Sequence, residues 1–322
     1  MSESELDALA GRLRDHPSIR SKLGIARATR ALGLSAASAG RPGDDAAALP
    51  RDGGFDLLAG EGFIPAFIED DPWFAGWCAV MVNLSDIAAM GGRSAAVVDQ
   101  VWAPSAEAAA PLLQGLRDAS AAYGVALVGG HTNLSAPALG LAASVFGKAQ
   151  RLITSFHAAP GDLLIAAVDH RGSYRNFDNF CAALDAPPDR LRRDLDLLPT
   201  LAEDELTRAG KDISQGGIIG TALMLAECSS VGIDIDVTAL TPPPGIAAER
   251  WLRSFPSFGF LLSVAPENAN AVCARFCARG IDACAIGRVT DGSAVTLGDG
   301  TESALFWDHA QTPYLDLGAC HA

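Results

Sequence analysis

The stretch NLSDIAAMGG, from Asn83 to Gly92, combines small and apolar residues with one carboxylate, Asp86, and ends on two glycines. A charged side chain in a packed setting costs free energy unless a cation or a hydrogen-bonding group meets it. If the stretch is helical, the neighbours of Asp86 on the same face are Asn83 and Met90, and neither is a cation. The partner of Asp86 must therefore come from elsewhere in the fold, or be a bound ion or water.

Around this stretch, the apolar pattern alternates between strands and helices. We expect a helix over residues 71–92, which the two glycines end, and another over residues 105–124, with Ser105 as N-cap and Gly124 as C-cap. Pro111 is an awkward residue inside this second helix. The predicted strands of this half span residues 55–63, 94–103, 125–130 and 138–149. This alternation predicts an α/β domain.

The rest of the chain extends the same pattern. The first 40 residues are largely helical in pattern, and a loop of small residues is expected over 35–50. A Pro-Gly turn after Ala158 opens a new strand, so we predict an N-terminal domain over residues 1–157 and a C-terminal domain over 158–322. In the second domain, helices are expected through roughly 177–209 and at 217–230 and 266–280. Strands are expected at 232–237, 258–264 and 281–289, and a short tail from residue 309.

The composition is that of an ordinary soluble protein, with 322 residues of which 49% are hydrophobic and 19% charged. Lys and Arg number 24 and Asp and Glu 38, which gives a formal charge of −14. Such a balance argues against nucleic acid and anionic membranes as partners, because no basic patch is evident to displace counterions. A phosphorylated small molecule is compatible with it only if metal ions offset the repulsion.

The cysteines and the apolar segments of the sequence indicate the cellular compartment in which we expect the protein. Seven cysteines without a CxxC spacing argue against a disulfide framework or a zinc site. Cys273 and Cys277 lie four residues apart beside Val272 and Phe276, so we expect them on the buried side of a helix. The N-terminus lacks the apolar core of a signal peptide, and the longest apolar run, residues 136–146, is too short to span a bilayer. A reducing cytoplasm is predicted.

Acidic residues stand in four glycine-rich or small-residue contexts: GDD (43–45), GEG (60–62), LSDIAAMGG (84–92) and KDISQGG (211–217). Small residues let a ligand approach the backbone closely. Mg²⁺ prefers oxygen ligands and commonly bridges carboxylates to substrate phosphates. If they gather, the acids of these motifs would form a metal site: Asp44, Asp45, Glu61, Asp86 and Asp212. Alternatively, each is separately a cap or a turn residue.

A fifth segment, VALVGGHTN, ends an apolar strand at Gly129 and Gly130 and continues with His131, Thr132 and Asn133. Polar groups just past a strand end are where α/β sites are usually built. A lone histidine there is alternatively a hydrogen-bonded structural residue. The chain has no Walker A loop, no GxGxxG after a strand and no GxSxG. A nucleotide would therefore be held mainly through metal.

In their order and spacing, GDDAA, NLSDIAAMGG, VGGHTN, APGD and DISQGG resemble the motifs of the AIR synthase superfamily. That superfamily includes thiamine-monophosphate kinase, selenophosphate synthetase and formylglycinamidine ribonucleotide synthetase. The resemblance runs from roughly Gly43 to Gly287. It implies a two-domain α/β fold, an N-terminal sheet that pairs across a homodimer, and ATP bound with Mg²⁺ on acidic residues.

The resemblance also implies roles for individual residues. The five acids named above would be metal ligands, and His131 a general base or a contact of the acceptor. The expected nucleotide and substrate contacts are Asn83, Gly129, Gly130, Thr132, Asn133, Lys148, Ser214, Gln215 and Gly216. The chain departs from the kinase pattern where His131 replaces an acid and Ser155 an arginine. It also lacks the N-terminal cysteine of the selenium enzyme. These departures place it outside the named branches.

The leading functional hypothesis is ATP- and Mg²⁺-dependent phosphoryl transfer to, or phosphate activation of, a small-molecule acceptor. His131 and Ser155 motivate an alternative, a nucleotide-binding or scaffolding relative that no longer catalyses. A third hypothesis is a thiamine-monophosphate kinase. The acceptor is not named by the sequence.

Overall fold

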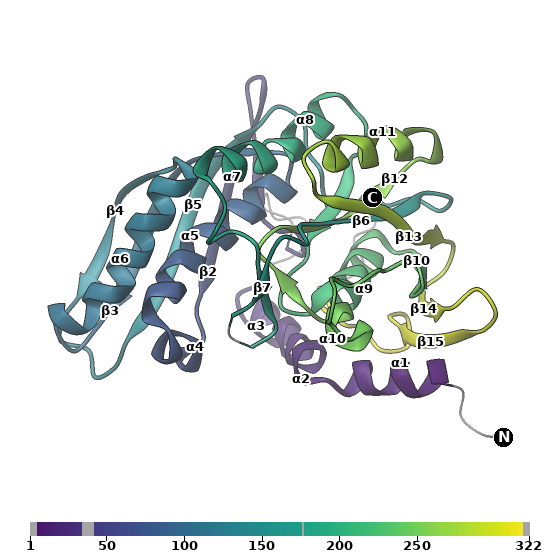
Figure 1. Ribbon diagram of the computed structural model, residues 1–322, viewed down its shortest axis with the longest axis horizontal. Helices are drawn as coiled ribbons and strands as arrows, with labels where there is room; N and C mark the ends of the chain where they lie inside the picture. Colours follow the sequence, from purple (N-terminus) through teal and green to yellow (C-terminus); the bar gives the residue numbers. More distant parts are fainter. Residues whose placement is uncertain (1–4, 34–41, 176, 318–322) are drawn as a thin grey trace. The chain divides into compact units, whose positions relative to one another are not determined.

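A computed structural model describes residues 5–33, 42–175 and 177–317 of the chain (Figure 1). The chain forms two compact units. The first, here the Asp86 unit, comprises Asp45–Leu152 and Asp185–Glu203. The second, here the Asp212 unit, comprises Met1–Asp44, Ile153–Leu184 and Asp204–Ala322. Each is a mixture of helices and a sheet, as the predicted α/β fold class requires.

The Asp86 unit is built on a five-stranded sheet in the order β1-β2-β5-β3-β4. Its strands are β1 (Ala47–Arg51), β2 (Gly54–Gly62), β3 (Arg93–Trp102), β4 (Ala126–Asn133) and β5 (Gly140–Ala149). Its helices are α4 (Pro65–Asp70), α5 (Pro72–Ala89), α6 (Ala106–Tyr123), α7 (Pro188–Leu195) and α8 (Leu197–Glu203). Among these five described strands, only β3 and β4 pair in parallel. A parallel pair needs a crossover, and α6 supplies it.

One face of this sheet is buried and the other is open. Leu57, Val97 and Val145 are fully buried on the face that α5 and α6 cover (Figure 1). The alternate residues point to the opposite face. There Leu58 is 52% exposed and its register partner Phe146 37% exposed. The sheet thus keeps an apolar surface that no helix of its own unit covers among the described residues.

Helices α5 and α6 approach each other closely because glycine stands at their contact. A Cβ on Gly115 would lie 1.9 Å from the carbonyl oxygen of Trp73, and one on Gly76 would lie 2.1 Å from that of Leu112. Helix α6 has the expected ends: the Ser105 hydroxyl accepts from the N–H of Ala108, and Gly124 is left-handed at φ +69°. Pro111 is accommodated inside α6.

The Asp212 unit is built on a seven-stranded sheet in the order β15-β14-β10-β13-β6-β12-β9. Its strands are β6 (Leu163–Val168), β9 (Ala209–Asp212), β10 (Gly232–Asp236), β12 (Gly259–Val264), β13 (Asp282–Thr290), β14 (Ala294–Gly298) and β15 (Ser303–Asp308). A small sheet joins β7 (Ser173–Tyr174), β8 (Asn179–Cys181) and β11 (Phe255–Pro256). The helices are α1 (Glu5–Asp15), α2 (Pro17–Arg20), η1 (Ser21–Gly24), α3 (Ile25–Ala31), α9 (Gly217–Ser229), α10 (Ala248–Leu252) and α11 (Pro266–Cys277).

The N-terminal helices pack in the Asp212 unit, where they contact residues that are more than 200 positions later in the sequence. The buried Tyr314 hydroxyl donates to the carbonyl of Ile19 at 2.9 Å, and Arg12 pairs with Glu249 at 3.0 Å. One carboxylate, Glu227, accepts from the backbone N–H groups of residues 314–316. These contacts group residues 1–44 with the C-terminal half of the chain. The predicted division of the sequence into domains 1–157 and 158–322 stays a prediction.

Several expectations for individual segments were wrong. Residues 177–209 do not form helices throughout, because β8 lies at 179–181 and pairs with strands distant in sequence. Part of the loop expected over 35–50 is strand β1, which pairs with β2; residues 34–41 lie outside the described residues. Val272 and Phe276 are fully buried on α11, but Cys273 is half-buried and Cys277 is exposed. No helix in the described ranges is long and apolar enough to cross a membrane.

The glycine contact between α5 and α6 gives a test of packing. We expect Gly115→Ala to lower the free energy of unfolding by about 1–3 kcal/mol, because the added methyl would force the two helix backbones apart. The matched control is Gly11→Ala in α1, whose Cβ would meet nothing nearer than 4.0 Å. That change should leave stability equal or raise it by up to about 1 kcal/mol. Urea unfolding measures both; equal effects would contradict the close contact.

Candidate functional site

Helix α5 carries Asp86 and is apolar almost throughout. Its N-cap is Asp71, whose side chain accepts from the N–H of Phe74 at 3.0 Å, and Pro72 stands at the first helical position. Gly91, with φ +71°, ends the helix in the left-handed conformation that glycine favours. Asp86 itself is only 7% exposed. A carboxylate at this depth is compatible with folding only where its charge is met.

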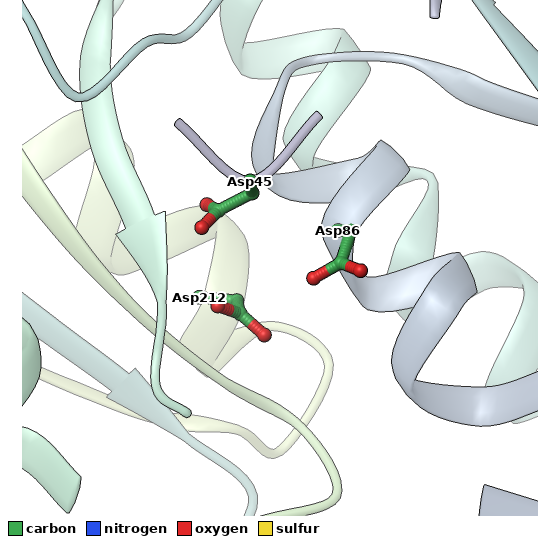
Figure 2. A group of neighbouring side chains, drawn as sticks. All are labelled: Asp45, Asp86 and Asp212. Atoms are coloured by element: carbon green, nitrogen blue, oxygen red, sulfur yellow. The ribbon is translucent and has the colours of Figure 1, made fainter. Parts of the chain in front are cut away.

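Asp45 is brought to Asp86 within the Asp86 unit. The two residues each offer a carboxylate oxygen, and these oxygens lie within 4.8 Å of each other (Figure 2). Like charges this close raise the free energy of the ionised pair, whereas a divalent cation between or beside them lowers it. The two residues therefore provide two of the oxygen ligands that a hard cation such as Mg²⁺ prefers.

Asn83 lies one turn before Asp86 on α5 and is fully buried. Its amide nitrogen donates to the carbonyl of Ala79 at 2.8 Å. Its amide oxygen Oδ1 is buried and meets no donor among the described residues. An unsatisfied buried acceptor costs free energy, which a bound water, ion or ligand donor would remove.

Asp212 ends strand β9 in the Asp212 unit and is 5% exposed (Figure 2). Beyond it, the chain turns into α9. The N–H of Gly217 donates to the carbonyl of Ser214 at 2.8 Å. Gly217 has φ +67°, and a Cβ there would lie 2.2 Å from Cα of Arg253, so this turn requires glycine. Gln215 is exposed, and Gly216 is the N-cap of α9.

Ser214 stands in this turn with an unused hydroxyl. Its backbone N–H donates to the Thr221 hydroxyl at 3.3 Å, while its own Oγ is buried without a partner in the described part of the chain. The first N–H groups of a helix such as α9 favour anions. The turn therefore gathers a carboxylate, a hydroxyl and a helix N-terminus in one short segment.

Asp44 is engaged differently from its neighbour Asp45. Within the Asp212 unit, its Oδ1 accepts from the backbone N–H of Ser155 at 3.0 Å and from the Ser155 hydroxyl at 2.8 Å. Ser155 is fully buried, and its carbonyl accepts from the Ser229 hydroxyl. Asp44 thus anchors the chain just before the Asp86 unit begins. Its role as a metal ligand stays a prediction.

The segment with His131 differs from its expected structure. Strand β4 does not end at Gly130 but continues to Asn133, because parallel pairing with β3 extends to the pair Trp102–Asn133. His131 and Thr132 are therefore exposed strand residues. The Asn133 side chain accepts from the N–H of Ser135 and shapes the turn that follows. Gly129, with φ +152°, lies just after the register shift between β3 and β4.

Two further predicted residues lie on neighbouring strands. Glu61 is exposed near the end of β2, in register with Ala143 of β5. Lys148 is exposed on β5, with its ammonium 5.8 Å from the centre of the Phe146 ring. The predicted roles of both stay predictions.

Two family models match the chain: AIR synthase related protein, N-terminal domain, over residues 43–149, and AIR synthase related protein, C-terminal domain, over residues 180–300. The uncharacterized protein sll0787 of Synechocystis sp. is 49% identical over 275 residues, which are 85% of each chain. The chain belongs to the AIR synthase related family. The resemblance inferred from the five motifs is thereby confirmed.

This AIR synthase related protein also resembles proteins with named activities. Thiamine-monophosphate kinase of Synechococcus elongatus is 28% identical over 288 residues, or 79% of this chain and 85% of the relative. The solved structure of AaThiL complexed with AMPPCP and TMP matches with a TM-score of 0.64 and 22% identity, covering 85% of this chain and 91% of that one. At this identity the match shows the fold alone, and it confirms the predicted fold.

The sequence did not lead us to predict one buried acidic residue of this AIR synthase related protein. Asp99 on β3 is 8% exposed, and burial raises the pKa of its carboxyl. It is in register with Gly130, where a Cβ would lie 2.5 Å from Oδ1 of Asp99. Gly130 thus makes room for a buried acid. The available signal was a lone carboxylate on the buried face of the strand VVDQVW.

Asp99→Asn tests this burial through stability. Because the pKa of Asp99 is raised in the folded protein, the wild type loses stability as pH rises from the unfolded value of about 3.9 through the folded pKa. We expect the variant to be more stable than wild type at pH 7, with the difference shrinking as pH falls. Urea unfolding between pH 4 and 8 measures it. Asp189→Asn, at a carboxylate 71% exposed, is the control, and identical pH profiles would contradict the expectation.

Proposed function

We propose that this protein is an ATP- and Mg²⁺-dependent enzyme that transfers a phosphoryl group to a small-molecule acceptor or activates a phosphate. The approach of Asp45 and Asp86 to within 4.8 Å carries the proposal. All the ligand atoms offered are carboxylate oxygens, which fits Mg²⁺ and not a soft metal. When bound, Mg²⁺ supplies positive charge that neutralises phosphate oxygens as charge develops in the transfer.

The protein's own residues then hold the ion and orient the phosphates. Asp45 and Asp86 would hold Mg²⁺, and we propose that Asp212 joins them as a third carboxylate, with Asp44 and Glu61 as further candidates. The buried Ser214 hydroxyl and the N-terminus of α9 would donate to phosphate oxygens. Gln215 and Gly216 belong to the same turn. Asn83 would accept a hydrogen bond from a water in the ion's shell through its unsatisfied Oδ1.

For the other predicted contacts with the nucleotide or the acceptor, the structure gives fewer distances and hydrogen bonds to argue from. The β4 residues Gly129, Gly130, Thr132 and Asn133, with Lys148 on β5, are proposed to line the nucleotide or acceptor. His131 is proposed as the general base or as an acceptor contact. ATP as the donor is supported by the thiamine-monophosphate kinase relatives and by the fold shared with a protein complexed with AMPPCP. A thiamine-monophosphate kinase activity is one specific form of this proposal.

A nucleotide-binding relative without catalysis is the second candidate. The fully buried Ser155 uses its N–H and hydroxyl to hold Asp44, at the position where the kinase pattern has an arginine. A missing phosphate-binding cation favours binding without turnover. Conversion of ATP to ADP by the purified protein separates the two candidates, since only the enzyme would transfer the γ-phosphoryl group, either to an acceptor or to water.

Asp86→Asn is the decisive change. The amide keeps the shape of the side chain but loses its charge, so we expect binding of AMPPCP with Mg²⁺ to weaken by about 10-fold or more. Without Mg²⁺, wild type and variant should bind AMPPCP equally weakly. Isothermal titration calorimetry measures both, with the exposed Asp189→Asn as control. Unchanged Mg²⁺-dependent affinity in Asp86→Asn would sink the metal assignment.

The open face of the sheet is proposed to pair with a second copy of the chain, as the family resemblance implies. Leu58 and Phe146 are register partners on that face, 52% and 37% exposed. We expect the double variant Leu58→Asp, Phe146→Asp to sediment as a monomer, because two buried charges would oppose the apolar contact. The control Leu305→Asp, at a leucine 47% exposed on β15, should stay dimeric. A monomeric wild type in analytical ultracentrifugation would refute the dimer.

A further inference from the structure

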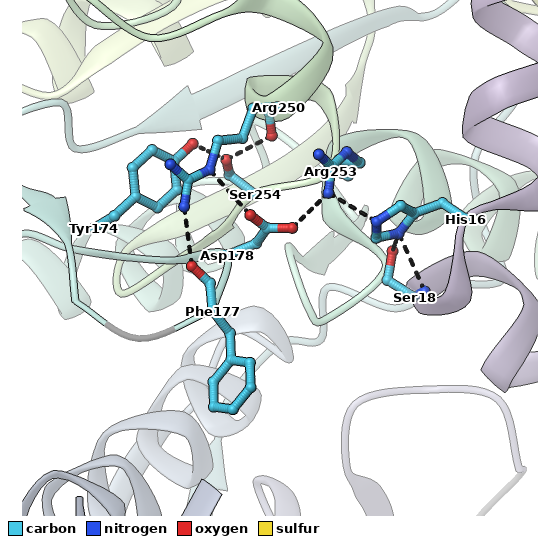
Figure 3. Close-up of polar contacts among 8 residues, drawn as sticks. All are labelled: His16, Ser18, Tyr174, Phe177, Asp178, Arg250, Arg253 and Ser254. Atoms are coloured by element: carbon cyan, nitrogen blue, oxygen red, sulfur yellow. Dashed lines mark hydrogen bonds and ion pairs between the residues drawn. The ribbon is translucent and has the colours of Figure 1, made fainter. Parts of the chain in front are cut away.

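A cluster of cationic side chains lies within the Asp212 unit, where two arginines face one carboxylate. Arg250 in α10 and Arg253 just after it share one carboxylate, Asp178, at 3.0 Å and 2.6 Å (Figure 3). His16, the N-cap of α2, accepts from Nη1 of Arg253 at 2.8 Å. Residues distant in sequence, from 16–18, 174, 177–178 and 250–254, thus meet here (Figure 3).

His16 acts in this cluster as a neutral acceptor. Arg253 can only donate, so Nε2 of His16 accepts from it, while Nδ1 of His16 lies 2.8 Å from the Ser18 hydroxyl oxygen and accepts from the backbone N–H of Ser18 at 3.2 Å. Burial lowers the pKa of His16, and the Arg253 guanidinium lowers it further. The histidine therefore orients Arg253 without adding or cancelling charge at neutral pH.

The guanidinium of Arg253 is only partly used. Its contacts to Asp178 and His16 are both made by Nη1. Its Nε is buried and meets no acceptor among the described residues, although the side chain as a whole is 21% exposed. An unsatisfied buried donor costs free energy, and a guanidinium edge is shaped to bind an oxyanion through two donors.

The charges of the cluster do not balance. Arg250 and Arg253 face one carboxylate, Asp178. The next acid, Glu249, is paired with Arg12 at 3.0 Å. With His16 neutral, these groups sum to one positive charge, in a chain whose formal charge is −14. A local excess of positive charge in an acidic protein favours an anionic ligand.

The loop that completes the cluster is strained. Phe177 has φ +57°, which is unfavourable for a non-glycine residue, and its side chain is 62% exposed. Arg250 holds this backbone by donating to the Phe177 carbonyl at 3.1 Å, and its guanidinium lies 3.5 Å from the centre of the Tyr174 ring. Tyr174 in turn hydrogen-bonds Ser254 (Figure 3). Strain held in place by several contacts is typical of ligand sites.

The cluster is also next to the turn proposed to bind phosphates. The Cα of Arg253 lies 2.2 Å from where a Cβ of Gly217 would be, so the two backbones touch. We propose that Arg253, oriented by His16 and Asp178, binds an oxyanion group of the acceptor, a phosphate or a carboxylate. Arg250 is a positioning residue, since it acts through Asp178 and the Phe177 backbone. This inference rests on the proposed function, because it assigns an acceptor to that enzyme.

Chemical modification of the intact wild-type protein tests the proposal without a variant. Phenylglyoxal modifies accessible arginines, and mass spectrometry reports the extent at each one. With Mg²⁺ and AMPPCP saturating, we expect millimolar inorganic phosphate to slow modification of Arg253 several-fold and to leave the exposed Arg193 unchanged. Acetate in place of phosphate distinguishes the two sources: protection at lower concentration indicates a carboxylate acceptor.

Variants supply the second measurement. In Arg253→Gln, the affinity for inorganic phosphate, measured by ³¹P NMR, should fall about 10-fold or more, while Mg²⁺-dependent AMPPCP binding stays as in wild type. Arg253→Lys keeps the charge without the forked donors and should bind with intermediate affinity. If Arg253→Gln does not fold, the Arg253→Lys variant and the modification experiment still test whether Arg253 binds an oxyanion.

The outcomes separate this inference from the proposed function. Normal AMPPCP binding with Arg253 unprotected by phosphate or acetate would overturn the anion site and leave the proposed function intact. Protection of Arg253 by AMPPCP alone would also overturn it, by assigning the residue to the nucleotide. If AMPPCP does not bind but phosphate still protects Arg253, the proposed function fails while the oxyanion site stands.

Discussion

The close placement of two carboxylates, whose oxygens lie within 4.8 Å of each other and one of which is almost fully buried, is the constraint on which the rest of the site depends. Asp86 is fixed by an apolar helix with a well-formed cap at its start and a glycine turn at its end, so it cannot swing into water. The helix in turn is fixed by its glycine contact with α6. The fold thus holds two carboxylate oxygens at a spacing that would suit a shared divalent cation.

Local patterns allowed much of the structure to be predicted. The caps at Ser105 and Gly124, the glycines after Asp86 and the alternation along β5 are local signals, and the corresponding elements formed. Strand β8 was missed because only pairing with distant strands makes it a strand. For the same reason β4 ran past Gly130. Asp99 was overlooked although it alternates with Val97 and Val101 in the strand, because that alternation indicates its burial only once α5 and α6 are known to cover this face.

In the candidate site, too, local sequence signals could be predicted and contacts between distant residues could not. Small neighbouring residues singled out a set of acids in the sequence, and the structure brings carboxylate oxygens of two of them, Asp45 and Asp86, within 4.8 Å of each other; their role as metal ligands stays a prediction. The sequence did not indicate that Ser155 would hold Asp44, nor that residues 16, 178 and 253 would meet. Those contacts join residues 75 to 237 positions apart in the sequence, and periodicity carries no information about them. Family resemblance supplied the order of the motifs but not these pairings.

Strand β4 has a consequence for how the protein behaves in solution. It lies at the edge of its sheet, and within the described residues it pairs only with β3, leaving backbone donors and acceptors along its other side. Its sequence, ALVGGHTN, contains none of the lysines or prolines that usually protect such edges, and Val128 is 62% exposed. An unprotected edge can recruit strands from other chains. Concentrated folded protein is therefore expected to be prone to self-association, and the assemblies would grow by strand addition at β4.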